Sequence, residues 1–451
     1  MNLKTKTSGL FSTLLLLSCF SGMGQDSTRT ITLNEAIDLG IKNSKPLRAS
    51  KARMEEASAA LTQARQNKLP DFKITGAYLR VTQPQVDLKV KLGSNNNGSG
   101  GSSASDIKVN QAAYGIANVS LPLYSGMRIQ YGIRSAEFLE KAAALDADND
   151  KEDVVINTIG AFSNLYKANA NVRLIRENLA QSRSRDSDFN NLEINGLLAR
   201  NDKLKAALQT SNIELNLVDA ENNLKVTTVN MNLLLGLPEH GVIVPDSNSL
   251  RQEVILKAID DYEQLAIQNR KDVQAVQYRK KATAVGIQSA KSDYYPSLAL
   301  TGGYIAADVP NLVTITNAVT FGVGVSYNVA SLWKTNAKVA QAKARLSEAE
   351  ANEEYLNDQV KLEINQAYEG YISAEKKMEV SHKAIEQATE NYKINKNKYD
   401  NSLVTVTDLL DANVTLLQAK IGLELARADA VVAYNTLLEK AGMLTVTLNS
   451  K

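Results

Sequence analysis

Cysteine and histidine are nearly missing from this sequence, which holds one cysteine (Cys19) and two histidines (His240 and His382) in 451 residues. These two residue types are the usual protein ligands of zinc, so their scarcity argues against a zinc site. Neither histidine belongs to a recognisable catalytic constellation, and we find no other such constellation. We therefore expect no metal, no cofactor and no enzymatic activity.

The sequence also lacks an excess of charge, since 51 Lys and Arg face 49 Asp and Glu and give a net charge of +2. A nucleic-acid-binding protein needs a basic stripe, and none emerges, so we expect no nucleic-acid partner. Aromatic residues make up 6% of the chain and prolines number 8. The abundance of Ala, Leu, Lys, Glu, Asn and Gln is instead typical of long helices.

A long apolar run is absent after residue 24, so no later segment reads as a membrane-spanning helix. At the N-terminus two lysines precede a short apolar run at residues 10–20, and a small-x-small pattern ends at Gly24. This arrangement predicts an export signal peptide at residues 1–24. A second interpretation stays open, in which Cys19 belongs to a lipoprotein box and is lipidated rather than removed.

The first half of the chain repeats in the second half. A shift of 226 residues aligns the early part of each copy and a shift of 206 the later part, so the first copy carries about 20 extra residues. The Gly-, Ser- and Asn-rich tract at residues 93–103 lies among them and is predicted to form an exposed loop tip. The repeats are residues 25–245 and 246–451. The aligned pairs include Pro70 with Pro296, Tyr78 with Tyr304, Leu197 with Leu403, Asp202 with Asp408, and Gly236 with Gly442.

Four segments alternate apolar and polar residues with a period of two, two in each copy. The first follows Pro70 and its counterpart follows Pro296, while the others cover residues 115–123 and 321–329. Each is about 10 residues long, which is enough for a tilted strand to cross a bilayer. Tyr124 and Trp333 come at their ends, where an aromatic girdle is expected.

Long helical segments surround these strands. A helix is predicted from the N-cap Thr32 to about residue 68, interrupted near Pro46. Residues 126–195 and 331–401 contain no proline, and each helix would reach about 100 Å. After a short break, each is followed by a further helix with the alternating three- and four-residue apolar spacing of a coiled coil.

Four membrane-length strands cannot close a barrel, and open sheet edges are not tolerated in lipid. The smallest single-chain barrels have eight strands, so several chains must contribute to one barrel. The predicted fold is an α/β membrane protein, a trimeric 12-stranded transmembrane β-barrel with four strands per chain, continuous with a long α-helical coiled-coil periplasmic tunnel. The alternative is a secreted structural coiled coil or adhesin-like stalk without a pore.

The chain resembles the TolC-type outer-membrane efflux proteins over essentially its whole mature length. The resemblance rests on the tandem repeat, on the helix–proline–strand junctions at Pro70 and Pro296, and on the segment at residues 401–412. It implies a homotrimer in the outer-membrane lipid that serves as a passive exit duct. Its partners would be a periplasmic adaptor and an inner-membrane pump, in a tripartite efflux or type I secretion system.

Two carboxylates after the second break are the candidate gate. Asp408 and Asp411 are spaced i, i+3 and therefore share one helical face. In a trimer they would form two stacked rings that favour cations, and the resemblance implies that they line the periplasmic mouth. The alternative is that Asp408 only caps a helix N-terminus, where acidic residues are favoured.

The resemblance also implies a latch that holds this mouth closed. Asp202 and Tyr399 fall on two of its positions, while Lys205 stands where the second copy has Asp411. At a further latch position the family has an arginine and this chain has Val404, which cannot make a charge-assisted bond. We therefore expect a different or weaker latch.

Apolar residues at the two breaks are candidate partner contacts, because ordinary turns are polar and exposed apolar tips mark interaction sites. The resemblance implies that the partner is the helical hairpin of the adaptor. The alternative is that the turns are buried within the protein. The residues concerned are Gly196, Leu197 and Leu198 at the first break and Ser402, Leu403 and Val404 at the second.

Overall fold

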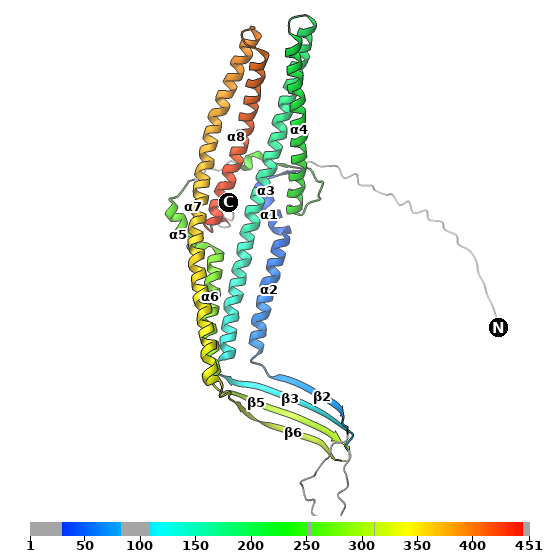
Figure 1. The fold of residues 1–451 in the computed structure, drawn as a ribbon, viewed down its shortest axis with the longest axis vertical. Coiled ribbons are helices and arrows are strands. Elements are labelled where there is room, and N and C mark those ends of the chain that lie inside the picture. The colour runs from blue at the N-terminus through cyan, green and yellow to red at the C-terminus, as the bar shows by residue number, and fades with distance from the viewer. Residues whose placement is uncertain (1–28, 83–108, 251–254, 311, 445–451) are drawn as a thin grey trace, which may run out of the picture.

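The computed structural model describes residues 29–82, 109–250, 255–310 and 312–444. A column of long helices stands on one end of a four-stranded sheet (Figure 1). The predicted signal peptide with Cys19 and the predicted loop tip at residues 93–103 lie outside the described residues. No helix in the described part of the chain is both long enough and apolar enough to cross a membrane.

The two copies share a succession of two helices, two strands and two long helices, and they differ in the short strands and 3-10 turns around it. The first copy comprises β1 (Arg29–Ile31), α1 (Leu33–Asn43), α2 (Lys45–Gln66), β2 (Asp71–Arg80), β3 (Gln111–Ser125), α3 (Arg128–Ile194), α4 (Arg200–Leu235) and β4 (Ile243–Pro245). The second comprises the 3-10 turn η1 (Ser247–Leu250), α5 (Ile259–Asn269), α6 (Lys271–Lys291), the 3-10 turn η2 (Ser292–Tyr294), β5 (Ser297–Val309), β6 (Val313–Ser326), α7 (Ser331–Asp400) and α8 (Val406–Lys440).

The predicted interruption of the first helix is confirmed at Ser44. This residue has an extended backbone and its hydroxyl caps α2 by accepting a 3.2 Å hydrogen bond from the backbone N–H of Leu47. Pro46 lies in the first turn of α2, where a missing N–H costs nothing. In the second copy Arg270 stands at the equivalent position and separates α5 from α6.

The sheet is antiparallel throughout, in the order β2-β3-β5-β6. Its register separates the side chains into two faces, because residues that pair directly across strands point to the same side. One paired row consists of Phe72, Val119, Gly302 and Phe321, and the next consists of Lys73, Asn118, Gly303 and Thr320. One face of the sheet is therefore apolar and the other is polar.

Strand β6 is longer at its start than predicted. It begins at Val313 rather than at residue 321, and it ends at Ser326. The register shifts by one residue opposite Ile305, where Asn317 adopts a positive φ of 60°. A bulge of this kind reverses the face to which the side chains beyond it point, so the alternation does not run unbroken along the whole strand.

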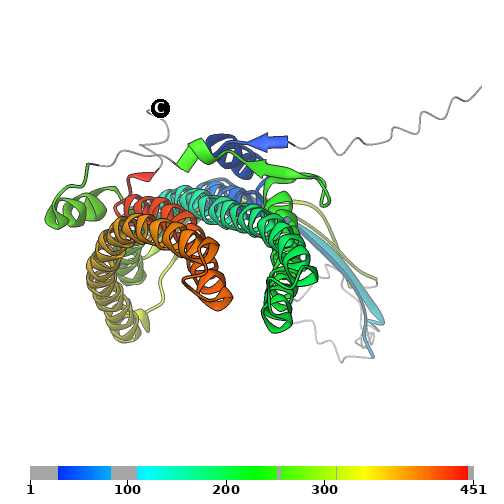
Figure 2. The same ribbon diagram turned by 90° about the horizontal axis from the view of Figure 1, so that it is seen from above.

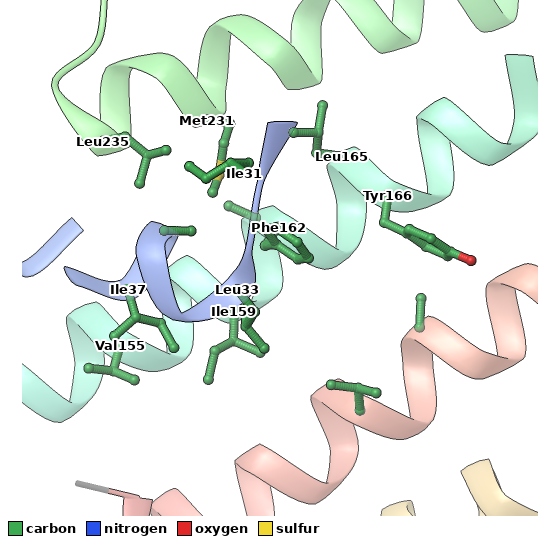
Figure 3. Packing of buried hydrophobic residues seen from close by; sticks show 14 of the residues in the cluster. Ile31, Leu33, Ile37, Val155, Ile159, Phe162, Leu165, Tyr166, Met231 and Leu235 are labelled. Atoms are coloured by element: carbon green, nitrogen blue, oxygen red, sulfur yellow. The ribbon is translucent and has the colours of Figure 1, made fainter. Parts of the chain in front are cut away.

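The main core lies at mid-height of the column and joins the two copies. Ile31, Phe162, Met231 and Leu235 are fully buried and pack with Ala428 of α8. Each large apolar side chain buried in this way contributes about 1.5–3 kcal/mol. Figure 3 shows β1 and α1 facing α3 through Ile31, Leu33, Ile37, Val155, Ile159 and Phe162.

Above this core α3 pairs with α4 and α7 pairs with α8, so two hairpins rise away from the sheet (Figure 1). Below it, α2 packs against α3 and α6 against α7. Viewed from above, the helices follow an arc instead of closing into a bundle (Figure 2). Within the described residues, no helix lies across the concave side of this arc (Figure 2).

Candidate gate at the helical tips

Each hairpin turns at its tip through the same backbone motif. Gly196 after α3 and Ser402 after α7 have left-handed backbones, with φ of 73° and 59°. The next residues, Leu197 and Leu403, each donate a 2.8 Å hydrogen bond to the carbonyl five residues earlier. These bonds define a Schellman motif, so the two predicted breaks have equivalent geometry although one uses glycine and the other serine.

The tips carry exposed leucines. Leu197 is 75% exposed and Leu403 is 72% exposed, whereas Leu198 and Val404 are half-buried. Leu198 packs against a cluster beneath the tips. Within one chain, each turn therefore has one outward and one partly covered apolar side chain.

The cluster beneath the tips brings both hairpins together. Phe189 of α3, Ala206 of α4, and Val406 and Leu410 of α8 are buried there, with Tyr399 of α7 packed against them. The rings of Phe189 and Tyr399 lie 5.6 Å apart between centroids, in a tilted arrangement. This contact fixes the end of α7 against the end of α3.

Tyr399 and Asp202, the two predicted latch residues, lie close enough for the charge of Asp202 to act on Tyr399. Burial raises the pKa of Tyr399, and the charges of Asp202 and Asp400 raise it further. No hydrogen bond joins Tyr399 to Asp202 within the described chain; the Asp202 carboxylate instead lies 3.4 Å from Nζ of Lys205. The structure thus brings the pair close together without a direct link.

Asp408 caps its own helix. Its Oδ2 accepts hydrogen bonds of 2.9 Å from the backbone N–H and 2.7 Å from the hydroxyl of Thr405, and its N–H donates to Thr405 Oγ1. These bonds hold the pKa of Asp408 below its usual range, which keeps the carboxylate charged. Asp411 is exposed one turn later, and its carboxylate has no partner among the described residues.

Lys205, which the sequence marks only as a departure from the symmetry of the two copies, lies beside the candidate gate. Its Nζ donates a 3.3 Å hydrogen bond to Oγ1 of Thr407, the residue before Asp408. A lysine of the first copy therefore lies beside the acidic turn of the second. The contact depends on how α4 packs against α8, and no local sequence pattern predicts it.

Arg185 is a second residue that sequence reasoning missed. It lies on α3 close to Tyr392 of α7, and burial lowers the pKa of its guanidinium. One nitrogen donates to Ser182 Oγ at 3.2 Å, while Nε is buried without a hydrogen-bond partner. A partly unsatisfied cation between two hairpins is costly, and only the three-dimensional packing reveals it.

The described residues contain no group of three or more His, Cys, Asp or Glu side chains placed to hold a metal ion. The features at the tips are therefore carboxylates, hydroxyls, cations and exposed leucines. Such a set can position charge and contact a partner.

Long helices that continue into a four-stranded antiparallel sheet are a fold shared with outer-membrane channels of known structure. The chain superposes on the Campylobacter jejuni CmeC outer membrane channel with a TM-score of 0.73 and 18% identity, covering 91% of this chain and 86% of that one. It superposes on the Neisseria gonorrhoeae MtrE outer membrane channel, in its open state, with a TM-score of 0.69 and 16% identity, covering 91% and 89%.

The sequence identifies the family. The profile of the outer membrane efflux proteins matches residues 36–237 and 263–443, so this chain belongs to that family. It is also 22% identical over 442 residues to the outer membrane efflux protein BepC of Brucella suis biovar 1 (strain 1330), covering 92% of this chain and 86% of BepC. The predicted resemblance is confirmed: the chain is an outer-membrane protein of an efflux channel family with a long periplasmic extension.

Proposed function

We propose that three copies of this chain form a passive exit duct, a 12-stranded barrel in the outer membrane continuous with a helical tunnel in the periplasm. The observation that carries the proposal is the two-faced sheet. Its apolar face holds exposed side chains such as Phe321 at 83%, Ile74 at 74% and Val325 at 69% exposed. Such a face suits lipid, and the polar face suits a water-filled lumen.

The two edges of the sheet supply the contacts between copies. Among the described strands, β2 and β6 each pair on one side only, and unpaired backbone groups are not tolerated in lipid. β6 of one copy runs antiparallel to β2 of the next, as an antiparallel barrel requires. Four strands are too few for a barrel, and three copies give twelve.

Exposed apolar stripes on the helices favour the same assembly. On α4, Leu208, Leu215 and Val218 are 64%, 65% and 63% exposed. On α7, Tyr355 and Leu362 are 71% and 57% exposed. The stripes recur at coiled-coil spacing, and neighbouring copies would cover them when three arcs of the kind in Figure 2 close into a tube.

In this assembly the tips form the periplasmic gate. Asp408 and Asp411 would each contribute to a ring of three carboxylates, which favours cations in a narrow pore. Asp202 and Tyr399 would belong to the latch that keeps the gate closed, with Lys205 moderating the negative charge. The capping role of Asp408 does not conflict with the ring, because a hydrogen-bonded carboxylate keeps its charge.

The tips would also meet the partner proteins. Leu197 and Leu403 project from rigid turns and present apolar surface at the end of each hairpin, as a docking site for the helical hairpin of a periplasmic adaptor requires. An inner-membrane pump would supply the energy. A secreted stalk without a pore would have no use for a sheet with one lipid-suited face.

Cysteine cross-linking tests the trimer. The chain's one cysteine lies within the predicted signal peptide, so Thr75→Cys on β2 is combined in turn with Thr320→Cys, Gly322→Cys or Gly324→Cys on β6. All four positions lie on the polar face. One register should bring the Cα atoms within disulfide reach and produce a covalent trimer in oxidised membranes.

The matched control places the first cysteine on the central strand β3, as Asn118→Cys, with the same β6 partners. Because β3 is flanked by β2 and β5, another chain's β6 cannot reach it. Monomers alone at all three β6 positions of the Thr75→Cys series would contradict the proposed assembly.

A further inference from the structure

A polar cavity lies where the strands end and the long helices begin. It holds about 340 Å³ between the ends of β3 and β6, the segment from η2 to the start of β5, and the starts of α3 and α7. These elements meet at the base of the column in Figure 1. Tyr295 is its one aromatic lining residue; the other lining residues are polar or charged, and six of them carry hydroxyl groups. A cavity of this composition is unsuited to an apolar ligand.

The charges around the cavity are unbalanced. Arg128, Lys334 and Lys338 line it with a single carboxylate, Asp293. Asp293 is already paired twice, with Arg128 at 3.8 Å and with Lys338. Lys334 has no carboxylate partner in the described part of the chain. The cavity therefore carries a surplus of two positive charges.

A buried hydroxyl in the cavity wall lacks a partner. Ser331, the first residue of α7, is 8% exposed and lines the cavity, and its Oγ makes no hydrogen bond. The first N–H groups of α7 donate hydrogen bonds to carbonyls of the preceding loop, so they are not free to bind a ligand. The positive end of the α7 dipole still lies at the cavity and favours a negative charge there. A buried polar atom without a partner calls for an explanation, and a hydrogen bond to a ligand oxygen, formed when the Ser331 hydroxyl turns toward the cavity, would supply one.

The strand ends add a row of serines. Ser125 pairs with Ser297, which pairs with Ser326. This row follows the apolar row of Tyr124, Leu298 and Val325, so it lies on the polar face of the sheet. In the proposed duct that face lines the lumen, and three copies would place three such cavities around it.

The geometry points to a binding site for a phosphate-type oxyanion in this cavity. A phosphate group carries up to two negative charges and accepts hydrogen bonds at several oxygens, which matches the two surplus cations and the hydroxyl-rich wall. Lysine and arginine are the side chains that bind phosphate through charge-assisted hydrogen bonds. A water-soluble phosphate compound in the lumen would reach this polar face directly, whereas a lipid headgroup would reach the cavity only from the outer rim of the sheet.

Calorimetric titration of the detergent-solubilised full chain with sodium phosphate tests the site. We expect saturable binding that Lys334→Gln weakens about tenfold, because one charged hydrogen bond is lost. Ser331→Ala should also weaken binding, by about threefold, without changing the charge. The control variants Lys343→Gln and Ser347→Ala change the same residue types on exposed turns of α7 and should bind as the wild type does.

Competition then separates the two sources of phosphate. Glycerol 3-phosphate displacing inorganic phosphate more effectively than dihexanoylphosphatidic acid would indicate a water-soluble ligand, and the reverse order would indicate a lipid headgroup. Thermal melting of each variant checks that the junction stays folded. Absence of saturable binding, or binding that Lys334→Gln and Lys343→Gln weaken equally, would overturn the inference.

Discussion

Arg270 connects three elements at the waist of the protein, and its replacement by glutamine is the most informative single change for stability. The residue is 8% exposed. Its guanidinium lies 2.7 Å from Asp272 at the start of α6 and 2.7 Å from Glu363 on α7. Burial opposes the charged form of Arg270, but these two carboxylates outweigh that effect and raise its pKa.

The loss of stability in Arg270→Gln depends on how far Asp272 and Glu363 are buried once they have lost this partner. Removing one partner of a buried ion pair costs about 3–5 kcal/mol. Asp272 and Glu363 keep 28% and 21% of their side chains exposed, and Lys440 remains 3.5 Å from Glu363. We therefore expect a loss of about 2–3 kcal/mol, below the fully buried case. For a chain of this length that lowers the melting temperature by about 2–4 °C.

The loss should depend on pH with a definite sign. Burial raises the pKa of Asp272 and Glu363, but the hydrogen bonds and charge of Arg270 outweigh it and hold both below their usual range. A carboxylate whose pKa is lower in the folded state than in the unfolded state stabilises the protein fully when the pH is above its unfolded-state pKa, which is about 4 here. This stabilisation is lost as the pH falls through the folded-state pKa. The gap between wild type and Arg270→Gln should be full at neutral pH and narrow below about pH 4.

Thermal melting followed by circular dichroism, in one detergent and at one scan rate, measures the gap. The matched control is Arg176→Gln, which removes an exposed pair with Glu221 whose side chains are 61% and 36% exposed. Such a pair is worth under about 1 kcal/mol. Equal shifts for the two variants, or a gap that does not change with pH, would refute the reasoning.

The remaining predictions concern the tips. Ser402→Gly should stabilise the protein by about 0.5–1 kcal/mol in the same melting experiment, because Ser402 holds a left-handed backbone (φ 59°) that glycine adopts freely. Gly196→Ala (φ 73°) should destabilise the protein by a similar amount for the same reason. A change of the opposite sign in either variant would contradict the Schellman geometry. Tyr399→Phe or Asp202→Ala should raise the resting conductance in planar bilayers, and an unchanged conductance would rule out the latch. Asp411→Asn should lower cation selectivity, read from the reversal potential across a salt gradient.

The large elements of this fold are readable from the sequence because their patterns are long and repeated. The period-two segments, the proline-free tracts and the break near Pro46 all correspond to observed strands, helices and the kink at Ser44. The early part of β6 was missed because its bulge depends on a single residue, Asn317, in a positive-φ conformation. The alternation of apolar and polar residues does not predict where a residue adopts a positive φ.

The contacts of the candidate gate are less predictable than its position. The i, i+3 spacing of Asp408 and Asp411 and the apolar residues of the tips are visible in the sequence itself. The capping alternative for Asp408 describes the hydrogen bonds that this residue makes within one chain. The approach of Lys205 to Thr407 and the burial of Arg185 arise where hairpins far apart in the sequence meet. No local pattern encodes such a meeting.

Single-channel recording of the purified full chain in planar lipid bilayers measures whether this protein is a passive pore. We expect discrete conductance steps from the wild type and larger resting steps when the proposed latch residue Asp202 is replaced by alanine. Oligomers that reconstitute into bilayers but conduct no ions, in the wild type and in Asp202→Ala alike, would show that the protein is not a passive pore.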